Sequence, residues 1–356
     1  MRFGGSKKTK KGYDEMKYDE KKMVLSEAAV EEVQKAYSAV AEDYLDTQKQ
    51  QENVVGMGIG VKWTNGEPTG EPALVVLVTH KLEKDQLSPA NLVPAKLADM
   101  QTDVLSVGIP FAGEKESLDT RVQTLANRIR PAKGGYSVGH YKITAGTIAT
   151  CVYDRLQEGI GIPSRYYILS NNHVLANSND ASPGDPILQP GPFDGGTDPK
   201  DRIARLSRFV PIMFDPPIPR DRHRNLVDAA VAEGEFSDLD REIYWIGDLR
   251  GWRRRSNVKV GSLVKKTGRT TNFTIGRITA VNATIDVNFG GGRIARFRDQ
   301  IVTTNMSAGG DSGSLVTSLD NVAVGLLFAG SNVATIINQI ENVRRLLRVE
   351  VAERIL

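Results

Sequence analysis

Residues 309–314 read GGDSGS, and this string decides the fold and the chemistry that we predict for the chain. Gly309, Gly310 and Gly313 flank Ser312 closely, which allows a tight turn whose backbone amides face one point. We therefore take Ser312 as a candidate nucleophile, and the amides of Gly310 and Ser312 as candidate donors to an oxyanion. Polar loops with this short string are common, so the string alone supports an ordinary loop and a nucleophile equally.

A serine hydroxyl is a poor nucleophile at neutral pH unless a base accepts its proton, and histidine suits that role. The best candidate is His173 in the string ILSNNHVL at residues 168–175, where an apolar strand leads into the histidine. The alternative is a strand-end histidine held by local hydrogen bonds. The other histidines fit less well. His80 ends a strand, His140 sits at the entrance of the expected barrel, and His223 lies in a loop rich in Pro and Arg that we interpret as solvated.

Asp228 is the candidate carboxylate that would orient the base, in the string NLVDAAVA at residues 225–232. A carboxylate enclosed by apolar residues is expensive to bury unless it is paired, and the His173 imidazole would compensate it. A surface-strand aspartate is the alternative. The order His173, Asp228, Ser312 is one of the known orders of a catalytic triad, and the spacing places the first two residues in one barrel and the serine in a second.

The composition is that of a globular protein, with 40% hydrophobic and 25% charged residues in a chain of 356. A net charge of +3 gives no reason to expect nucleic-acid binding. Cys151 is the single cysteine, so no disulfide forms within the chain. The sequence shows no signal peptide, and no run reaches the roughly 18 apolar residues of a membrane span. We expect a soluble, cytoplasmic protein that uses no metal or other cofactor.

The N-terminal part divides into a tail and a helix. Residues 1–23 are charged and rich in Lys and Gly, which predicts a disordered tail. Residues 24–52 predict a helix that starts near Ser26, because apolar residues recur at spacings of three and four along one stripe. We favour packing of this helix on its own chain over self-association. The stripe consists of Val30, Val33, Tyr37, Val40 and Tyr44.

Residues 53–111 predict a small ββαβ unit, in which residues 87–97 form a weak helix interrupted by two prolines. Gly56, Gly58 and Gly60 lie at alternate positions of its first strand. Their spacing does not match a dinucleotide-binding loop. Glycines at alternate strand positions instead indicate a flat face where another backbone approaches closely.

The remaining chain predicts a linker followed by a β domain. Residues 112–135 are polar and basic, which is typical of a linker, and residues 136–356 contain many short strand-like runs separated by Gly, Pro and Asn. The fold class that we predict is mainly β: a double β-barrel over residues 136–356, preceded by a helix and a small α+β unit. A C-terminal helix is predicted from the spacing of Ile336, Ile337, Ile340, Val343, Leu346 and Leu347.

These strings together resemble the chymotrypsin-like serine peptidases, and more closely their bacterial branch with the streptogrisins and α-lytic peptidases. Residues 264–276, VKKTGRTTNFTIG, resemble a strand pair of that branch in which Lys265 and Ile275 would usually be cysteines. The chain also resembles intracellular trypsin-like proteins of bacteria and plants, including the narrow-leaf type, in which a ββαβ unit precedes the peptidase domain. Residues 189–196, QPGPFDGG, form the kind of loop that those proteins carry, and the resemblance covers residues 53–347.

The resemblance implies a serine endopeptidase that hydrolyses protein or peptide substrates through an acyl-enzyme, with His173, Asp228 and Ser312 as its triad. A second hypothesis is an inactive peptidase-like scaffold for binding or assembly, with oligomers formed through the N-terminal helix. A weaker one is a nucleic-acid or nucleotide binder that uses the arginines at 253–255 or 220–224, which we interpret as solvated loops.

The resemblance also implies a substrate-binding region. It places Met306 at the floor of the primary pocket and aligns Phe328, Ala329 and Gly330 with the strand that pairs with substrate. No acidic residue stands at the pocket floor, so a preference for Lys or Arg is not expected. We predict cleavage after an uncharged, mainly apolar residue.

Three positions depart from the better-known members. Asn172 replaces an alanine before the histidine, and we expect little effect. Phe328 stands where a serine usually hydrogen-bonds the triad aspartate, so Asp228 is expected to lack one partner. Asp311 would pair with a new N-terminus after activating cleavage in trypsin. Because residues near Tyr136 hardly resemble a cleavage site, we expect an internal donor for Asp311 and no cleavage.

Overall fold

The computed structural model describes residues 19–51, 53–82, 86–113, 124–155 and 163–352. The disordered tail predicted at residues 1–23 therefore lies mostly outside the described residues, as does part of the linker predicted at 112–135. The described part of that linker is not featureless. It contains strand β5 (Ala132–Gly134), which pairs in parallel with β13 (Leu239–Ile243).

The predicted N-terminal helix is present as α1 (Glu27–Tyr44). Ser26 caps it, because its hydroxyl accepts the Ala29 backbone N–H at 3.2 Å. The apolar stripe faces the rest of the chain: Val33 is fully buried, and the Tyr37 hydroxyl lies 2.6 Å from the Thr284 hydroxyl. The helix thus packs on its own chain, the alternative that the sequence favoured.

The N-terminal α+β unit consists of β1 (Val54–Thr64), β2 (Glu67–Val78), β3 (Lys96–Leu97) and β4 (Met100–Ser106). Strand β2 pairs antiparallel with β1 and parallel with β4. The helix predicted at residues 87–97 is wrong: the described residues form only a 3-10 turn, η3 (Pro89–Asn91), before β3. Prolines in this stretch remove amide donors that an α-helix needs.

The glycines of β1 allow this unit to join the barrel that follows it in sequence. Strand β1 pairs antiparallel with β16 (Asn272–Asn288). A Cβ atom on Gly56 would overlap the Thr284 carbonyl oxygen, and one on Gly60 would lie 2.9 Å from the Thr279 carbonyl oxygen. The predicted close backbone approach is therefore confirmed, and the α+β unit shares a continuous sheet with the second barrel.

Within the described residues this sheet has 11 strands, and part of it closes into a barrel. The closing strands run in the order β15-β18-β19-β20-β17-β16, and β15 also pairs with β16. Phe297 and Phe328 lie at the centre of this region, with ring centroids 4.6 Å apart. The new strands are β15 (Leu263–Gly268), β17 (Ile294–Thr304), β18 (Leu315–Ser318), β19 (Val322–Gly330), β20 (Ala334–Gln339) and, paired with β19, β14 (Gly251–Trp252).

The first barrel is formed by an eight-stranded sheet of the described residues, in the order β21-β8-β9-β12-β11-β10-β6-β7. Its apolar centre contains Ile168, Leu175 and Ile187, all fully buried. The strands are β6 (Ser137–His140), β7 (Gly146–Thr147), β8 (Thr150–Asp154), β9 (Tyr166–Ser170), β10 (Pro186–Leu188), β11 (Arg202–Phe209), β12 (Ala230–Gly234) and β21 (Val349–Glu350).

Short helices connect the strands. The α-helix α2 (Asn172–Leu175) follows β9 directly. The 3-10 turns are η1 (Glu20–Met23), η4 (Thr124–Ala126), η5 (Asn177–Asn179), η6 (Pro192–Asp194), η7 (Arg220–Arg222), η8 (Phe236–Asp238) and η9 (Arg255–Asn257).

The C-terminal helix α3 (Ile340–Leu347) is shorter than predicted. Ile336 and Ile337 belong to β20 instead, where β-branched side chains pack well. From the end of β20, α3 leads the chain back to the first barrel, because β21 pairs there with β8. Arg344 of α3 stacks over the Trp252 ring at 3.7 Å and pairs with Glu350, which ties this return to both barrels.

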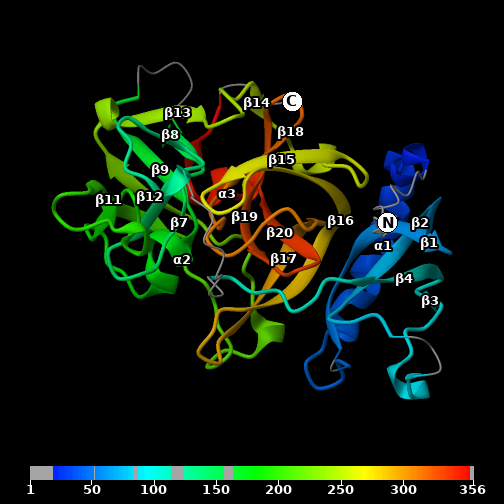
Figure 1. The fold of residues 1–356 in the computed structure, drawn as a ribbon. Helices are drawn as coiled ribbons and strands as arrows, with labels where there is room; N and C mark the ends of the chain where they lie inside the picture. The colour runs from blue at the N-terminus through cyan, green and yellow to red at the C-terminus, as the bar shows by residue number, and fades with distance from the viewer. Residues whose placement is uncertain (1–18, 52, 83–85, 114–123, 156–162, 353–356) are drawn as a thin grey trace, which may run out of the picture.

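The predicted mainly β class, with a double barrel, a preceding helix and α+β unit, and a C-terminal helix, is confirmed. Figure 1 shows the first barrel in green, the second in yellow to red at the centre, and the N-terminal unit in blue on the side of the second barrel away from the first. Among the described helices none has the length and apolar character to cross a lipid bilayer.

Candidate active site

His173 and Asp228 meet where two neighbouring strands of the first barrel place them. His173 lies on α2 just after β9, and Asp228 lies just before β12. These strands are antiparallel, with Ala230 opposite Ser170, so the end of one adjoins the start of the other. The His173 Nδ1 atom lies 2.5 Å from Asp228 Oδ2, and the His173 backbone N–H donates to Oδ1 at 3.1 Å. The carboxylate therefore fixes the ring orientation and leaves Nε2 as the outward nitrogen.

Asp228 is fully buried and is anchored by both barrels. The Asn171 side chain donates to the Asp228 carbonyl at 2.7 Å. From β20, the Asn338 side-chain oxygen accepts the Asp228 backbone N–H at 3.0 Å, and the Asn338 amide donates to Gln300 at 2.7 Å. The Phe328 side chain points into the core and gives Asp228 no hydroxyl, as expected, yet both carboxylate oxygens are engaged by His173 itself.

The loop that carries Ser312 comes from the second barrel and is seated on the first. The Thr147 backbone N–H donates to the Ser312 carbonyl at 2.7 Å, and a Cβ atom on Gly313 would overlap the Ser170 hydroxyl. The nucleophile loop is therefore seated on the first barrel at the ends of β7 and β9. The Ser312 hydroxyl donates to the Phe328 carbonyl at 3.5 Å, and the buried His173 Nε2 has no hydrogen-bond partner among the described residues.

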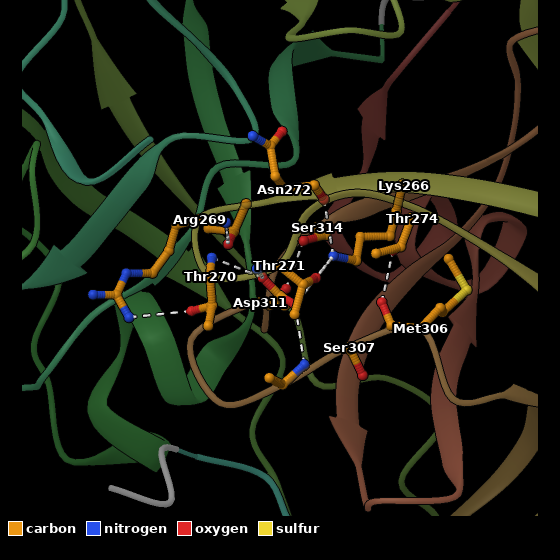
Figure 2. A network of polar contacts seen from close by, with 12 residues as sticks. Lys266, Arg269, Thr270, Thr271, Asn272, Thr274, Met306, Ser307, Asp311 and Ser314 are labelled. Atoms are coloured by element: carbon orange, nitrogen blue, oxygen red, sulfur yellow. Dashed lines mark hydrogen bonds and ion pairs between the residues drawn. The ribbon is translucent and has the colours of Figure 1, made fainter. Parts of the chain in front are cut away.

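Asp311, next to the nucleophile, is held by a dense set of donors (Figure 2). Its Oδ1 atom accepts the backbone N–H groups of Thr270 at 2.9 Å and Thr271 at 3.1 Å. Its Oδ2 atom accepts the Thr271 hydroxyl at 2.6 Å and the Ala308 backbone N–H at 3.0 Å. Lys266 Nζ donates to the same Oδ2 at 3.0 Å. The expected internal donors for Asp311 are thus present, and Lys266 is the charged one.

Lys266 and Asp311 form an ion pair with both side chains fully buried. Burial lowers the pKa of the Lys266 ammonium, and the Asp311 carboxylate opposes that shift. The ammonium also donates to the Thr271 hydroxyl and, at 3.2 Å, to the Asn272 carbonyl. With all three of its donors used, the charge is compensated without water, as a buried ion requires.

A second buried ion pair joins the turn after β15, which packs on the nucleophile loop, to the 189–196 loop. Arg269 pairs with Asp194, whose carboxylate also accepts the Ser137 hydroxyl at 2.5 Å. A Cβ atom on Gly310 would lie 2.5 Å from the Arg269 guanidinium, and Gly310 has φ +91°, so only glycine fits there. This arrangement fixes the peptide groups of the nucleophile turn.

The candidate oxyanion donors are available. The Gly309 carbonyl, which belongs to the same peptide group as the Gly310 N–H, accepts the Thr270 hydroxyl at 2.7 Å and so holds that group. Within the described residues, neither the Gly310 N–H nor the Ser312 N–H donates to any group. Two unpaired amides on a fixed turn beside a serine can bind an oxygen that becomes negative during acyl transfer.

A cavity of about 570 Å³ opens beside Ser312, and Ala329 and Gly330 are among the residues that line it. Met306 does not line it. Its side chain is buried in the core of the second barrel, against Gly276, so the placement of Met306 at the pocket floor is wrong. The Phe328 side chain is also fully buried, and only its carbonyl reaches the site.

The residues on either side of Met306 form the pocket wall instead, because strand-like alternation sends the Met306 side chain inward. They are Asn305 and Ser307, and with Ser331 and Asn332, which follow β19, they form the polar part of the wall. The Ser307 hydroxyl lies 2.7 Å from the Thr335 hydroxyl, and the Ser331 hydroxyl accepts the Ala334 N–H at 3.2 Å. The N-terminal unit and the residues after it also contribute to the lining, with His80, Gly108, Ile109, Phe111 and Gly113.

Two other histidines, His223 and His140, are buried in structural contacts, and the prediction about His223 is wrong. His223 is fully buried, not solvated: Nε2 donates to the Ile218 carbonyl at 2.8 Å and Nδ1 accepts the Arg296 N–H at 3.1 Å. Burial lowers the pKa of His223. His140 lies 3.1 Å from Asp185, and burial likewise lowers its pKa.

The described residues give little support to a cysteine nucleophile or a metal site. Burial raises the pKa of Cys151 to about 12, so this thiol is not a competing nucleophile. No group of three or more His, Cys, Asp or Glu side chains that could hold a metal is present in the described part of the chain. Lys265 and Ile275 lie directly opposite each other on β15 and β16.

Three supporting residues were not identified from the sequence: Lys266, Thr147 and Asn338. The burial of Lys266 could have been predicted, because it follows Val264 by two positions on a strand and therefore points to the same inward face. Thr147 and Asn338 carried none, since their contacts join segments far apart in sequence.

The sequence is similar to known proteins over parts of its length. Residues 44–107 match the NARROW LEAF 1 N-terminal domain. "Serine protease 2" of Streptomyces fradiae is 36% identical over 103 residues, 28% of this chain and 56% of that protein. "Glutamyl endopeptidase 2" of Streptomyces griseus is 48% identical over 58 residues, 16% of this chain and 28% of that protein. The chain thus spans about half, or less, of the curated relatives it matches.

Solved structures with a similar arrangement include proteases from other bacteria. Thermobifida fusca Protease A has a TM-score of 0.42 and 16% identity, covering 61% of this chain and 96% of that one. Nocardiopsis protease has a TM-score of 0.42 and 19% identity, covering 61% of this chain and 97% of that one.

Proposed function

We propose that this chain, which is similar to chymotrypsin-like serine proteases and matches the NARROW LEAF 1 N-terminal domain, is a serine endopeptidase. His173, Asp228 and Ser312 are its triad, and Gly310 and Ser312 supply the oxyanion donors. The observation that carries this proposal is the His173–Asp228 pair, whose Nε2 atom has no partner among the described residues, at the end of β9 on which the Ser312 loop is seated. The substrate is a protein or peptide.

The reaction follows from the positions of these groups. Rotation of the Ser312 hydroxyl from the Phe328 carbonyl toward His173 completes the triad when substrate binds. Nε2 then takes the hydroxyl proton as Oγ attacks the scissile carbonyl carbon, and Asp228 stabilises the imidazolium. The two amides hold the oxyanion, the amine leaves with the proton from His173, and water hydrolyses the acyl-enzyme by the same route in reverse.

The nucleophile turn needs no activating cleavage in this proposal. Lys266 supplies from inside the chain the positive charge that Asp311 requires, and both groups are already buried. Residues near Tyr136 are part of the first barrel, where β6 begins at Ser137. N-terminal sequencing of active protein should therefore not find a chain that starts near Tyr136, and such a start would contradict this part of the proposal.

Cleavage specificity is proposed from the pocket wall. The apolar preference predicted from the sequence depended on Met306, which lies elsewhere. The hydroxyl of Ser307 and the amide groups of Asn305 and Asn332 suit a side chain that accepts hydrogen bonds, and the lining contains no acidic residue for Lys or Arg. One relative is named a glutamyl endopeptidase. We infer a preference for Gln or Glu before the scissile bond.

A cytoplasmic location is part of the same proposal. The buried, unpaired Cys151 is compatible with a reducing compartment.

The proposal is tested with a fluorophosphonate probe, which reacts with activated serines. The parent protein should be labelled, and Ser312→Ala should not. No labelling of the parent, or equal labelling of both proteins, would favour the scaffold hypothesis. A peptide set that varies only the residue before the scissile bond tests specificity: Gln and Glu should be cleaved best and Lys worst. Leading cleavage after Lys or Arg would refute the pocket assignment.

A further inference from the structure

One edge of β19 extends past the nucleophile beyond the start of β18. Strand β18 covers this edge as far as Leu326, and Leu327 exchanges main-chain hydrogen bonds with Gly313 and Ser314 of the nucleophile loop. Beyond it, β19 continues past the Ser312 hydroxyl, which donates to the Phe328 carbonyl, and ends at Gly330. A free strand edge binds an extended peptide by main-chain hydrogen bonds. A substrate held beside Ser312 would therefore pair with this edge of β19.

The chain itself occupies that edge at Gly330. The Phe111 N–H donates to the Gly330 carbonyl at 3.0 Å, and the Gly330 N–H donates to the Phe111 carbonyl at 3.1 Å. The two residues thus form an antiparallel β-bridge. We call residues 107–113, which contain Phe111, the strap. The strap begins at the last residue that matches the N-terminal domain family.

The strap runs toward the nucleophile. In an antiparallel register with Phe111 opposite Gly330, Gly113 comes opposite Phe328. The same cavity is lined by Gly113 and Ser312, in agreement with this register. A peptide that extended along β19 to Gly330 would need the position that Phe111 fills.

The strap is held from its other side and from its start. On the edge away from β19, the Ala112 N–H donates to the Asn288 carbonyl at 2.9 Å, and the Asn288 N–H donates to the Pro110 carbonyl at 3.0 Å. At its start, the Val107 carbonyl accepts the Ser331 hydroxyl at 2.6 Å. The N-terminal unit therefore delivers a fixed strand into the substrate groove.

We propose that the strap is an intramolecular competitor of extended substrates, which it excludes from β19 by pairing with Gly330. This inference rests on the proposed peptidase function. A long peptide must displace Phe111 before it can pair, so its apparent affinity is reduced by the fraction of molecules with the strap released. A short substrate that ends before Gly330 makes no use of that position and is unaffected.

The strap makes a prediction for the parent protein alone. Peptides with two, three, four and five residues before the scissile bond, otherwise identical, are compared by kcat/KM. With the strap in place, kcat/KM should stay within about twofold beyond the second residue, because further residues gain no pairing with β19. A rise of tenfold or more, about 1.4 kcal/mol, with the third or fourth residue would overturn the proposal.

A matched pair of variants then tests release. Phe111→Pro removes the N–H that bonds Gly330, whereas Phe111→Ala keeps both main-chain bonds. In Phe111→Pro, the ratio of kcat/KM for the longest peptide to kcat/KM for the two-residue substrate should rise about 5- to 10-fold, as expected for the loss of about one backbone hydrogen bond. Phe111→Ala should raise kcat/KM for the longest peptide less than Phe111→Pro does.

Fluorophosphonate labelling separates the two levels of the proposal, because this small probe needs no pairing with β19. If Ser312 is labelled equally in the parent and in folded Phe111→Pro but the longest peptide gains nothing, the strap proposal fails and the peptidase proposal stands. If neither protein is labelled, the proposed function fails, and the strap proposal fails too because it depends on that function. If circular dichroism shows that Phe111→Pro does not fold, the strap proposal is tested by the dependence of kcat/KM on peptide length in the parent protein.

Discussion

The substitution Lys266→Met removes the buried cation beside the nucleophile turn and keeps most of the side-chain volume. It leaves the Asp311 carboxylate buried with no opposite charge. Four donors remain to it, from Thr270, Thr271 and Ala308, and they hold the carboxylate without neutralising it.

The expected loss of stability follows from this geometry. Removing one partner of a buried ion pair costs about 3–5 kcal/mol. Both side chains are fully buried, so no solvent screening reduces the value, and the four remaining donors place it near the lower end, at about 3 kcal/mol. The double variant Lys266→Met/Asp311→Asn removes both charges and should lose less than Lys266→Met alone.

The assay is chemical unfolding followed by circular dichroism, combined with the rate of fluorophosphonate labelling. Labelling of folded Lys266→Met should slow at least about tenfold, because Asp311 adjoins the oxyanion amides and one such donor is worth about 10²–10³. Lys265→Met is the matched control: this neighbouring lysine bonds Leu319 and Asn321 away from the site and should change stability by less than about 1 kcal/mol. Equal stability and equal labelling of the Lys266 and Lys265 variants would refute the reasoning.

Three further outcomes are expected. Gly56→Ala should destabilise the protein by about 2–3 kcal/mol in chemical unfolding, because the added methyl group would overlap a carbonyl oxygen of β16. The control Gly66→Ala should lose only about 1 kcal/mol, because Gly66 lies in open space and only its φ of +81° is unfavourable for alanine. Stability should fall as pH drops below about 6.5, because the unfolded chain takes up a proton there while burial keeps His223 neutral, and the slope is at most about 1.4 kcal/mol per pH unit for this group. His223→Asn keeps an acceptor for the Arg296 N–H. In this variant the free energy of unfolding should change less with pH between pH 5 and 7.5 than in the parent, and an unchanged slope would contradict this. Ser307→Asp should raise cleavage after Lys relative to Gln in the peptide set, and an unchanged ratio would remove Ser307 from the pocket wall.

The sequence was most informative where the candidate catalytic residues lie in short, recognisable sequence motifs. The strings around His173, Asp228 and Ser312 each end or begin a strand, and their order indicated how two barrels would bring them together. The close approach of another backbone to β1 was also predictable, because glycines at alternate strand positions usually mark such a contact.

The sequence was least informative where one pattern fits two structures or where a contact joins distant segments. Ile336 and Ile337 continue the helical spacing of α3, yet they lie in β20, because their β-branched side chains fill a strand equally well. Met306 was placed by its distance from Ser312, and only the structure shows which face of the chain it occupies. The Phe111–Gly330 bridge joins residues that no local pattern relates.

The identity of the nucleophile is tested most directly by locating the fluorophosphonate adduct. The tryptic peptide that contains Ser312 also contains Ser307 and Ser314, so fragment spectra can assign the modified residue. We predict an adduct on Ser312 alone, and its loss in folded His173→Ala. An adduct on Ser307 or Ser314, or undiminished labelling without His173, would contradict the proposed triad.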